Sequence, residues 1–156
     1  IDILQQSVSD ARNVSHQLTP QSFKDEGLVE ALSNLFLDFS RIDKSVRYTF
    51  HSTCKVIEPE DHIAINIYRV VQEFVNNSQK HSEAKNINLN LFFEEVTFLL
   101  EIKDDGKGFN ISSPNTGSGI GIKNMIKRIE SIGGEHKFEA AVSKGVVLTI
   151  RIPYSI

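Results

Sequence analysis

The sequence KDDGKGFNISSPNTGSGIG, residues 103–121, is the stretch from which the fold of this chain can be worked out. It holds five of the chain's nine glycines, in two clusters that a loop rich in Ser, Asn, Pro and Thr separates. Glycine adds no side chain to a core and loses more conformational entropy on folding than any other residue. Such a density indicates that the backbone comes close to a ligand or takes positive φ, and a phosphate-bearing ligand is the natural candidate.

Length and composition favour one compact domain. The chain has 156 residues, of which 40% are hydrophobic and 24% are charged, and no apolar run approaches the ~20 residues needed to cross a bilayer. The net charge of −3 gives no electrostatic reason to expect a nucleic-acid surface. Cys54 is the only cysteine, which excludes an internal disulfide and a Cys-based zinc site, so we expect a cytoplasmic chain.

Helical and strand periodicities follow one another along the chain. Apolar residues at steps of three and four predict helices, and apolar residues at every second position predict strands. The predicted helices cover 1–18, 28–42, about 60–81 and 120–132, and the predicted strands cover 45–54, 87–93, 96–104, about 135–141 and about 146–153. Because neighbouring strands form hairpins, we expect an α+β sandwich with a mixed sheet rather than a doubly wound parallel sheet.

Two polar features stand out against this apolar pattern. The helix over 60–81 carries a second, wholly polar stripe at helical spacing, formed by Asn66, Arg69, Glu73, Asn77 and Lys80. In the strand over 96–104 one face carries Val96, Phe98, Leu100 and Ile102, and the period of two puts Asp104 on that face as well. Burying a carboxylate costs several kcal/mol unless it is hydrogen-bonded, so Asp104 requires a partner in the protein or in a ligand.

The spacing of the glycines excludes the common phosphate loops. GSGIGIK (117–123) lacks the GxxxxGK[ST] pattern of a P-loop, and Ile122 stands where a dinucleotide fingerprint needs its third glycine. The chain has no HRD or VAIK segment of a serine/threonine/tyrosine kinase either. What remains is the combination of the polar helix stripe, the acidic turn over 104–108 and the glycine loop over 117–121.

In this combination the chain resembles the ATP-binding catalytic domain of sensor histidine kinases, the Bergerat or GHKL fold, in the subfamily typified by nitrate and membrane-fluidity sensors. IYRVVQEFVNNSQKHSEAKNI (67–87) is similar to the N box, IKDDGKGF (102–109) to the G1 box, and GSGIGIKNMIKRIESIGGE (117–135) to the G2 box with its helix. The likeness covers about 45–153. It implies a two-layer sandwich of a mixed, mainly antiparallel sheet on helices.

The upstream part of the chain resembles the same kinases less sharply. Residues 15–32 are similar to the end of the dimerisation domain and the linker helix. The resemblance therefore implies a helical extension at the N-terminus, with 1–40 as the C-terminal part of the dimerisation helix and the linker helix, and 41–156 as the ATP-binding catalytic domain.

The resemblance also implies roles for individual residues. Asp104 would accept a hydrogen bond from the exocyclic amine of adenine, and Asn77 would offer its amide oxygen to Mg²⁺. Glu73 and Asn77 would be the catalytic pair, with Glu73 polarising a water or helping to hold the metal. The implied nucleotide-binding residues are Asn77, Lys80, His81, Asp104, Gly106, Gly108, Gly117, Gly119, Ile120 and Gly121. Residues 110–116 would form a mobile lid.

Taken singly, each of these segments has an ordinary structural explanation. The polar stripe can be a solvated helix face with an Arg69–Glu73 ion pair at i,i+4. Residues 104–108 can form an ordinary hairpin turn, and residues 117–121 can be a flexible connection. The three segments together, in the family's order, favour the nucleotide site over these explanations.

The phosphoacceptor histidine of the resembled subfamily is followed directly by Asp or Glu. The five histidines of this chain are His16, His51, His62, His81 and His136, and none of them is followed by an acid. His16 is interpreted as a bystander in the second dimerisation helix, and the acceptor is expected upstream of Ile1. We therefore expect binding of Mg-ATP without ordinary self-phosphorylation.

The resemblance implies several partners and leaves other functions open. It implies ATP, the protein's own dimerisation and phosphoacceptor domain, a response regulator and a homodimeric parent with room for an inner-membrane anchor. The first alternative is an anti-sigma-factor-type serine kinase of the same fold. An ATP hydrolase of the chaperone or mismatch-repair branch and a non-catalytic interaction module are further alternatives.

Overall fold

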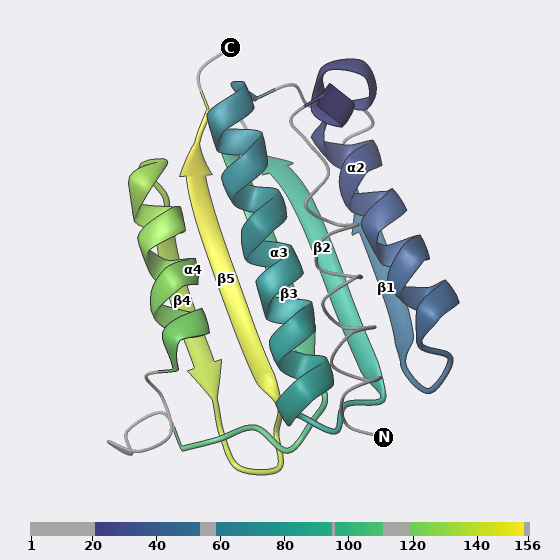
Figure 1. The fold of residues 1–156 in the computed structure, drawn as a ribbon. Coiled ribbons are helices and arrows are strands. Elements are labelled where there is room, and N and C mark those ends of the chain that lie inside the picture. The colour runs from purple at the N-terminus through teal and green to yellow at the C-terminus, as the bar shows by residue number, and fades with distance from the viewer. Residues whose placement is uncertain (1–20, 54–58, 95, 111–118, 155–156) are drawn as a thin grey trace.

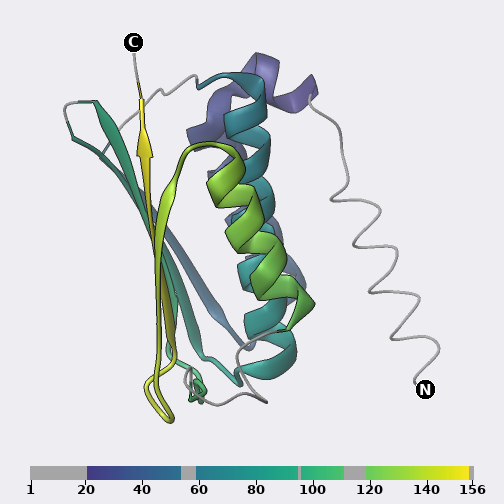
Figure 2. The same cartoon turned by 90° about the vertical axis from the view of Figure 1, so that its left-hand side faces the viewer.

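The computed structural model describes residues 21–53, 59–94, 96–110 and 119–154, with the side chains of 21–25 excepted. The described part forms a single sheet with helices packed on one of its faces (Figures 1 and 2). Its elements are α2 (Gln21–Ile42), β1 (Arg47–Ser52), α3 (Asp61–His81), β2 (Asn86–Glu94), β3 (Thr97–Asp104), α4 (Ile120–Ser131), β4 (Glu135–Ala140) and β5 (Val146–Pro153). The helix predicted over 1–18 lies outside the described residues.

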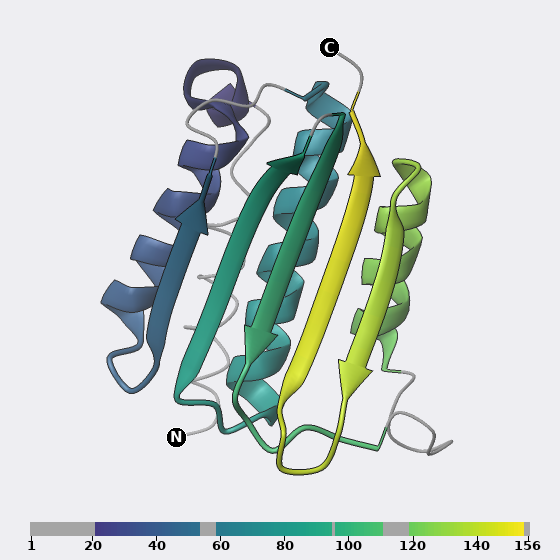
Figure 3. The same cartoon turned by 180° about the vertical axis from the view of Figure 1, so that it is seen from behind.

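The sheet is mixed, as the sequence predicts. Its strand order is β1-β2-β3-β5-β4. β1 pairs with β2 in parallel, across the connection that contains α3, and the other three pairings are antiparallel. Seen from behind, no described helix covers the opposite face of the sheet (Figure 3). This arrangement confirms the α+β sandwich.

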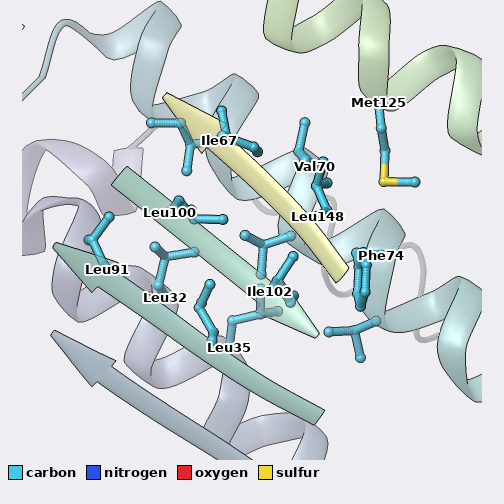
Figure 4. Close-up of a cluster of buried hydrophobic side chains, with 14 of the residues drawn as sticks. Leu32, Leu35, Ile67, Val70, Phe74, Leu91, Leu100, Ile102, Met125 and Leu148 are labelled. Carbon is cyan, nitrogen blue, oxygen red and sulfur yellow. The ribbon is translucent and has the colours of Figure 1, made fainter. Parts of the chain in front are cut away.

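The core lies between the sheet and the helices. Alternate residues of β2, β3 and β5 are buried, which is the burial expected of strands with one face on a core. Helix α2 adds Leu28, Leu32, Leu35, Phe36 and Phe39, none of them more than 4% exposed. In Figure 4, Leu32 and Leu35 lie among strand residues such as Leu91 and Ile102. Helix α2 is thus packed into the same core as the sheet.

Two details differ from the sequence prediction. Helix α2 begins at Gln21 rather than at 28, but Gly27 has φ 75° and ψ 165°, which breaks the helix where the prediction starts it. Val96 was expected on the core face of its strand and is 59% exposed. That expectation is wrong because Glu94 pairs with Thr97, which leaves Val96 in the connection between β2 and β3.

None of the helices in the described ranges combines the length and the apolar character that crossing a bilayer requires.

Candidate functional site

A cleft of about 460 Å³ opens where α3 and β3 end and α4 begins. These ends of the three elements lie at the lower end of the ribbon in Figure 1. Three chain segments that are far apart in sequence meet there: the last two turns of α3, the turn after β3 and the first turn of α4. The lining residues are Phe74, Asn77, Ser78, His81, Ser82, Asp104, Lys107, Gly108, Phe109, Gly119, Ile120, Gly121, Ile122, Met125, Phe138 and Val146. The three motif segments of the sequence therefore share one cavity.

Helix α3 presents one face to this cleft, which is apolar at Phe74 and polar beyond it. Phe74, Asn77, Ser78 and His81 stand at i, i+3, i+4 and i+7, so they lie on one side of the helix. Phe74 is buried at the core side, whereas His81 is exposed at the helix end. A single helical face thus joins the hydrophobic core to the mouth of the cleft.

Asp104 closes the buried row of β3. The burial pattern of this strand alternates through Phe98, Leu100 and Ile102 to Asp104, which is only 5% exposed. Its Oδ2 accepts a hydrogen bond from Ser78 Oγ at 2.7 Å, and its Oδ1 accepts one from the backbone N–H of Gly106 at 2.9 Å. These two donors offset the desolvation of the carboxylate, so the partner that the sequence demanded is supplied by the protein.

The turn after β3 is held from both sides. The backbone N–H of Lys107 donates to the carbonyl of Ser82 at the end of α3, and the N–H of Ser143 donates to the carbonyl of Lys107, both at 2.7 Å. Gly108 has φ 57° and passes so close to the carbonyl of Ala141 that a β-carbon would overlap it. Only glycine meets both conditions without strain. The turn is thereby fixed between α3 and the β4–β5 connection.

Asp105, next to the cleft acid, serves the turn rather than the cleft. Its Oδ1 accepts from the backbone N–H groups of Lys85 and Asn86, each at 2.8 Å, and its Oδ2 accepts from Asn86 Nδ2 at 2.6 Å. Burial by itself raises the pKa of Asp105, but the hydrogen bonds from Asn86 and Lys85 outweigh it and hold the pKa below its ordinary value. The two adjacent acids therefore have different surroundings.

Helix α4 begins against two polar side chains of α3. A β-carbon on Gly121 would lie 2.9 Å from Asn77 Nδ2 and closer still to Glu73 Oε1, so the missing side chain is what allows the approach. No side chain of the described residues caps this helix start at Gly119. The free N–H groups and the dipole of a helix start favour an anion.

Glu73 and Asn77 together offer oxygen atoms of the kind that a hard cation takes. Mg²⁺ commonly uses one or two protein oxygens and completes its shell with water and phosphate. The described residues contain no group of three or more His, Cys, Asp or Glu placed to hold a metal ion alone. The donor set next to Gly121 therefore fits a cation that is held jointly with a phosphate ligand.

The cleft brings together most of the residues predicted from sequence. The predicted residues that line it are Asn77, His81, Asp104, Gly108, Gly119, Ile120 and Gly121. Gly106 lies behind the lining, where it packs against Ser82 and holds Asp104. Lys80 is exposed and outside the lining, and Gly117 with most of the predicted lid falls outside the described residues.

Glu73 lines a neighbouring cleft instead. This second cleft, of about 430 Å³, runs between α3 and α4 and shares Met125 with the first. Its other lining residues are Arg69, Gln72, Asn124 and Arg128. Arg69 Nη1 donates to Gln72 Oε1 at 2.8 Å. Glu73 thus reaches the first cleft only at the contact with Gly121.

Sequence reasoning missed the serines and the apolar wall of the cleft. Ser78 and Ser82 are only 4% and 6% exposed. Ser78 follows Phe74 by four residues and Ser82 follows Ser78 by four, and this helical spacing is the signal that could have found them. The apolar wall includes Phe74, Ile122, Met125, Phe138 and Val146. Such a wall beside a few polar groups is typical of a small-molecule site.

The comparison with protein families agrees with this geometry. A family model described as "Histidine kinase-, DNA gyrase B-, and HSP90-like ATPase" matches residues 62–156, which is more than half of the chain. The chain therefore belongs to this family of ATPases. The relatives reported below, one curated protein and two solved structures, are histidine kinases.

One curated relative is the oxygen sensor histidine kinase NreB of Staphylococcus carnosus, 27% identical over 151 residues. The match covers 97% of this chain and 43% of NreB, so the chain spans less than half of that relative.

Several solved structures of histidine kinases share the fold, and two of them illustrate the likeness. The histidine kinase domain of the blue-light activated kinase of Erythrobacter litoralis EL346 superposes with a TM-score of 0.72 at 15% identity, covering 97% of this chain and 82% of that one. The histidine kinase AdeS of Acinetobacter baumannii superposes with a TM-score of 0.65 at 18% identity, and the match covers 99% of this chain and 80% of that one. At these identities the likeness concerns the fold alone.

Proposed function

We propose that this chain is the catalytic domain of a two-component sensor histidine kinase of the nitrate-sensor type, which transfers the γ-phosphoryl group of ATP to a histidine outside this chain. The bond between the γ-phosphorus and the bridging oxygen breaks, a phosphorus–nitrogen bond to the imidazole forms, and ADP leaves. The observation that carries the proposal is the single cleft that joins Asp104, Asn77 and the start of α4.

The cleft has two ends with different chemistry. We call the part around Asp104, Ser78 and Ser82 the base end, and the part around Asn77, Glu73 and Gly121 the phosphate end. At the base end, Asp104 accepts from the exocyclic amine of adenine while the apolar wall covers the ring. At the phosphate end, the glycine loop and the N–H groups of α4 receive the phosphates, with His81 and Lys80 near them.

Mg²⁺ fits the phosphate end, where Asn77 supplies an amide oxygen. When bound, Mg²⁺ would supply positive charge that offsets the negative charge of the phosphates. Glu73 contacts the same helix start and is proposed to orient the incoming group or a metal-bound water. Positioning and electrostatics of this kind account for most of the catalysis of phosphoryl transfer.

The remaining assignments concern the parent protein. We propose that residues 1–40 are the end of the dimerisation helix and the linker helix and that 41–156 are the catalytic domain, with α2 packed on the core as the rigid part of that connection. The domain would meet the phosphoacceptor domain of a homodimeric parent in the cytoplasm. A response regulator would then receive the phosphoryl group.

Two measurements test the proposed function. Calorimetric titration with ATP, with and without Mg²⁺, should give saturable binding that Mg²⁺ strengthens. Incubation with γ-labelled ATP should leave no stable label on the chain itself, whereas a longer protein that includes the acceptor histidine should carry label that acid removes and alkali does not. Absence of ATP binding overturns the proposal. Acid-stable label on a partner protein would favour the serine kinase, and steady ATP turnover by the chain alone would favour the hydrolase.

A further inference from the structure

The base end contains an unusual concentration of buried polar side chains. In the described residues the buried polar or charged side chains are Gln72, Ser78, Ser82 and Asp104. Three of these four line the same cleft, and each is hydrogen-bonded. A polar cluster that is buried next to a binding cleft fixes which ligand atoms can face it, because any unmatched polar atom loses a hydrogen bond.

The protons of this cluster all point into the protein. The hydroxyl of Ser82 donates to the carbonyl of Ser78 at 2.7 Å and accepts from the backbone N–H of Ala84 at 3.1 Å. The hydroxyl of Ser78 donates its single proton to Asp104 Oδ2. The N–H of Gly106 donates to Asp104 Oδ1. The polar side-chain atoms that remain for a ligand at the base end are therefore hydrogen-bond acceptors.

We infer that Ser78 is the positioning residue that makes the site select a 6-amino purine over a 6-oxo purine. This inference rests on the proposed binding of ATP. A 6-amino group can donate a hydrogen bond to the Asp104 carboxylate, whereas a 6-oxo group would place an oxygen against the same carboxylate. The purine would have to slide to offer its N1–H instead, and the carboxylate cannot follow because Ser78 and Gly106 hold one oxygen each.

Removal of the Ser78 hydroxyl changes this selection in a defined way. The substitution Ser78→Ala leaves space for about one water, which can donate to Asp104 Oδ2 in place of the hydroxyl. A water has a second proton, unlike the serine hydroxyl, and this proton can be donated to a 6-oxo oxygen. The variant should therefore lose discrimination rather than lose nucleotide binding altogether.

The experiment measures the Kd of ATP and of ITP, which lacks the 6-amino group and carries an oxygen there, for each protein by calorimetry with Mg²⁺ present. The wild-type chain should bind ITP about 100-fold more weakly than ATP. In Ser78→Ala, ATP should weaken by about 3- to 10-fold, and the ITP-to-ATP ratio of Kd values should fall about tenfold. Ser78→Thr keeps the hydroxyl and should restore the wild-type ratio within about twofold.

The matched control is Ser131→Ala, which removes an exposed helical serine hydroxyl that donates to the carbonyl of Arg128 on α4. It should leave the ratio unchanged. Because the ratio is taken on one preparation of each variant, partial unfolding cancels from it. An unchanged ratio in Ser78→Ala, with ATP still bound by the wild type, overturns the role of Ser78 and leaves the proposed function standing. Failure of the wild type to bind ATP overturns the proposed function itself.

Discussion

The base end and the phosphate end are lined by the same helix, α3, but the protein completes them to different degrees. At the base end Ser78, Ser82 and Asp104 are all hydrogen-bonded within the protein. At the phosphate end the side chains of Glu73 and Asn77 make no hydrogen bond to any other described residue. Polar groups that are already hydrogen-bonded are held in place before the ligand binds, so they can select the ligand. Polar groups that have no partner in the protein can find one in the ligand and its cation.

This difference can be tested with two ligands. Adenosine engages the base end alone, and ATP engages both ends. A change at the base end should therefore weaken both ligands, while a change at the phosphate end should weaken ATP and spare adenosine.

The largest effect is expected from Asp104→Asn. The amide removes the charge and one acceptor that faces the base, so ATP and adenosine should both bind roughly 100-fold more weakly. Calorimetric titration of each ligand measures this. The control Asp38→Asn removes a carboxylate that pairs with Arg41 on the exposed side of α2, and it should bind both ligands like the wild type. Wild-type affinity in Asp104→Asn would mean that the base is read elsewhere.

Asn77→Asp should have the next largest effect. It adds a negative charge beside the phosphates, so ATP should bind roughly 30-fold more weakly without Mg²⁺ and recover in part when Mg²⁺ is added. Adenosine should bind as in the wild type. Asn76→Asp adds the same charge one residue away and outside the lining of the cleft, so its effect on ATP should be small. Equal losses of adenosine and ATP in Asn77→Asp would contradict the division into two ends.

A smaller effect is expected from Gly121→Ala. The new β-carbon would displace Glu73 Oε1 and Asn77 Nδ2, which are the ends of flexible side chains, so the fold should survive while ATP weakens about tenfold. The matched control is Gly133→Ala beyond the other end of α4, where a β-carbon has no protein atom within 4 Å; its φ of 70° makes alanine strained, so this variant should lose some stability but bind ATP like the wild type. Fluorescence titration with an ATP analogue distinguishes the two variants. If both lose ATP equally, the contact with α3 is not what positions the helix start.

The elements of this fold could be predicted from sequence because their periodicities are strong. Asp104 was placed on the buried face of β3 by the period of two alone, and the alternation of burial confirms it. The exposed position of Val96 could not be predicted, since the register of β2 and β3 and not hydrophobicity decides where a strand ends.

The interior of the site was less predictable than its motifs. Ser78 and Asp104 are 26 residues apart, and a hydrogen bond between a helix and a strand leaves no periodic signal. Phe138 and Val146 line the cleft because β5 lies between β3 and β4, an order that no local pattern contains. The roles of all the predicted site residues remain predictions, and the cleft establishes only which of them lie together.

The smallest effect on nucleotide binding is expected from Asp105→Asn, which should change the stability of the fold instead. Its hydrogen bonds go to the start of β2 and not to the cleft, so ATP affinity should stay within about threefold of the wild type. The folded protein should lose about 1 kcal/mol of stability at neutral pH, a modest figure because this carboxylate is exposed to solvent.

The pH dependence of this loss follows from the pKa of Asp105. The folded-state pKa lies below the ordinary value of 3.8, so this stabilisation is present above that value and is lost as the pH falls through the depressed pKa. Urea unfolding of both proteins from neutral to acidic pH should therefore show a stability difference that shrinks below about pH 4; a difference that persists unchanged at pH ~2 would mean that the Asp105 charge is not its source.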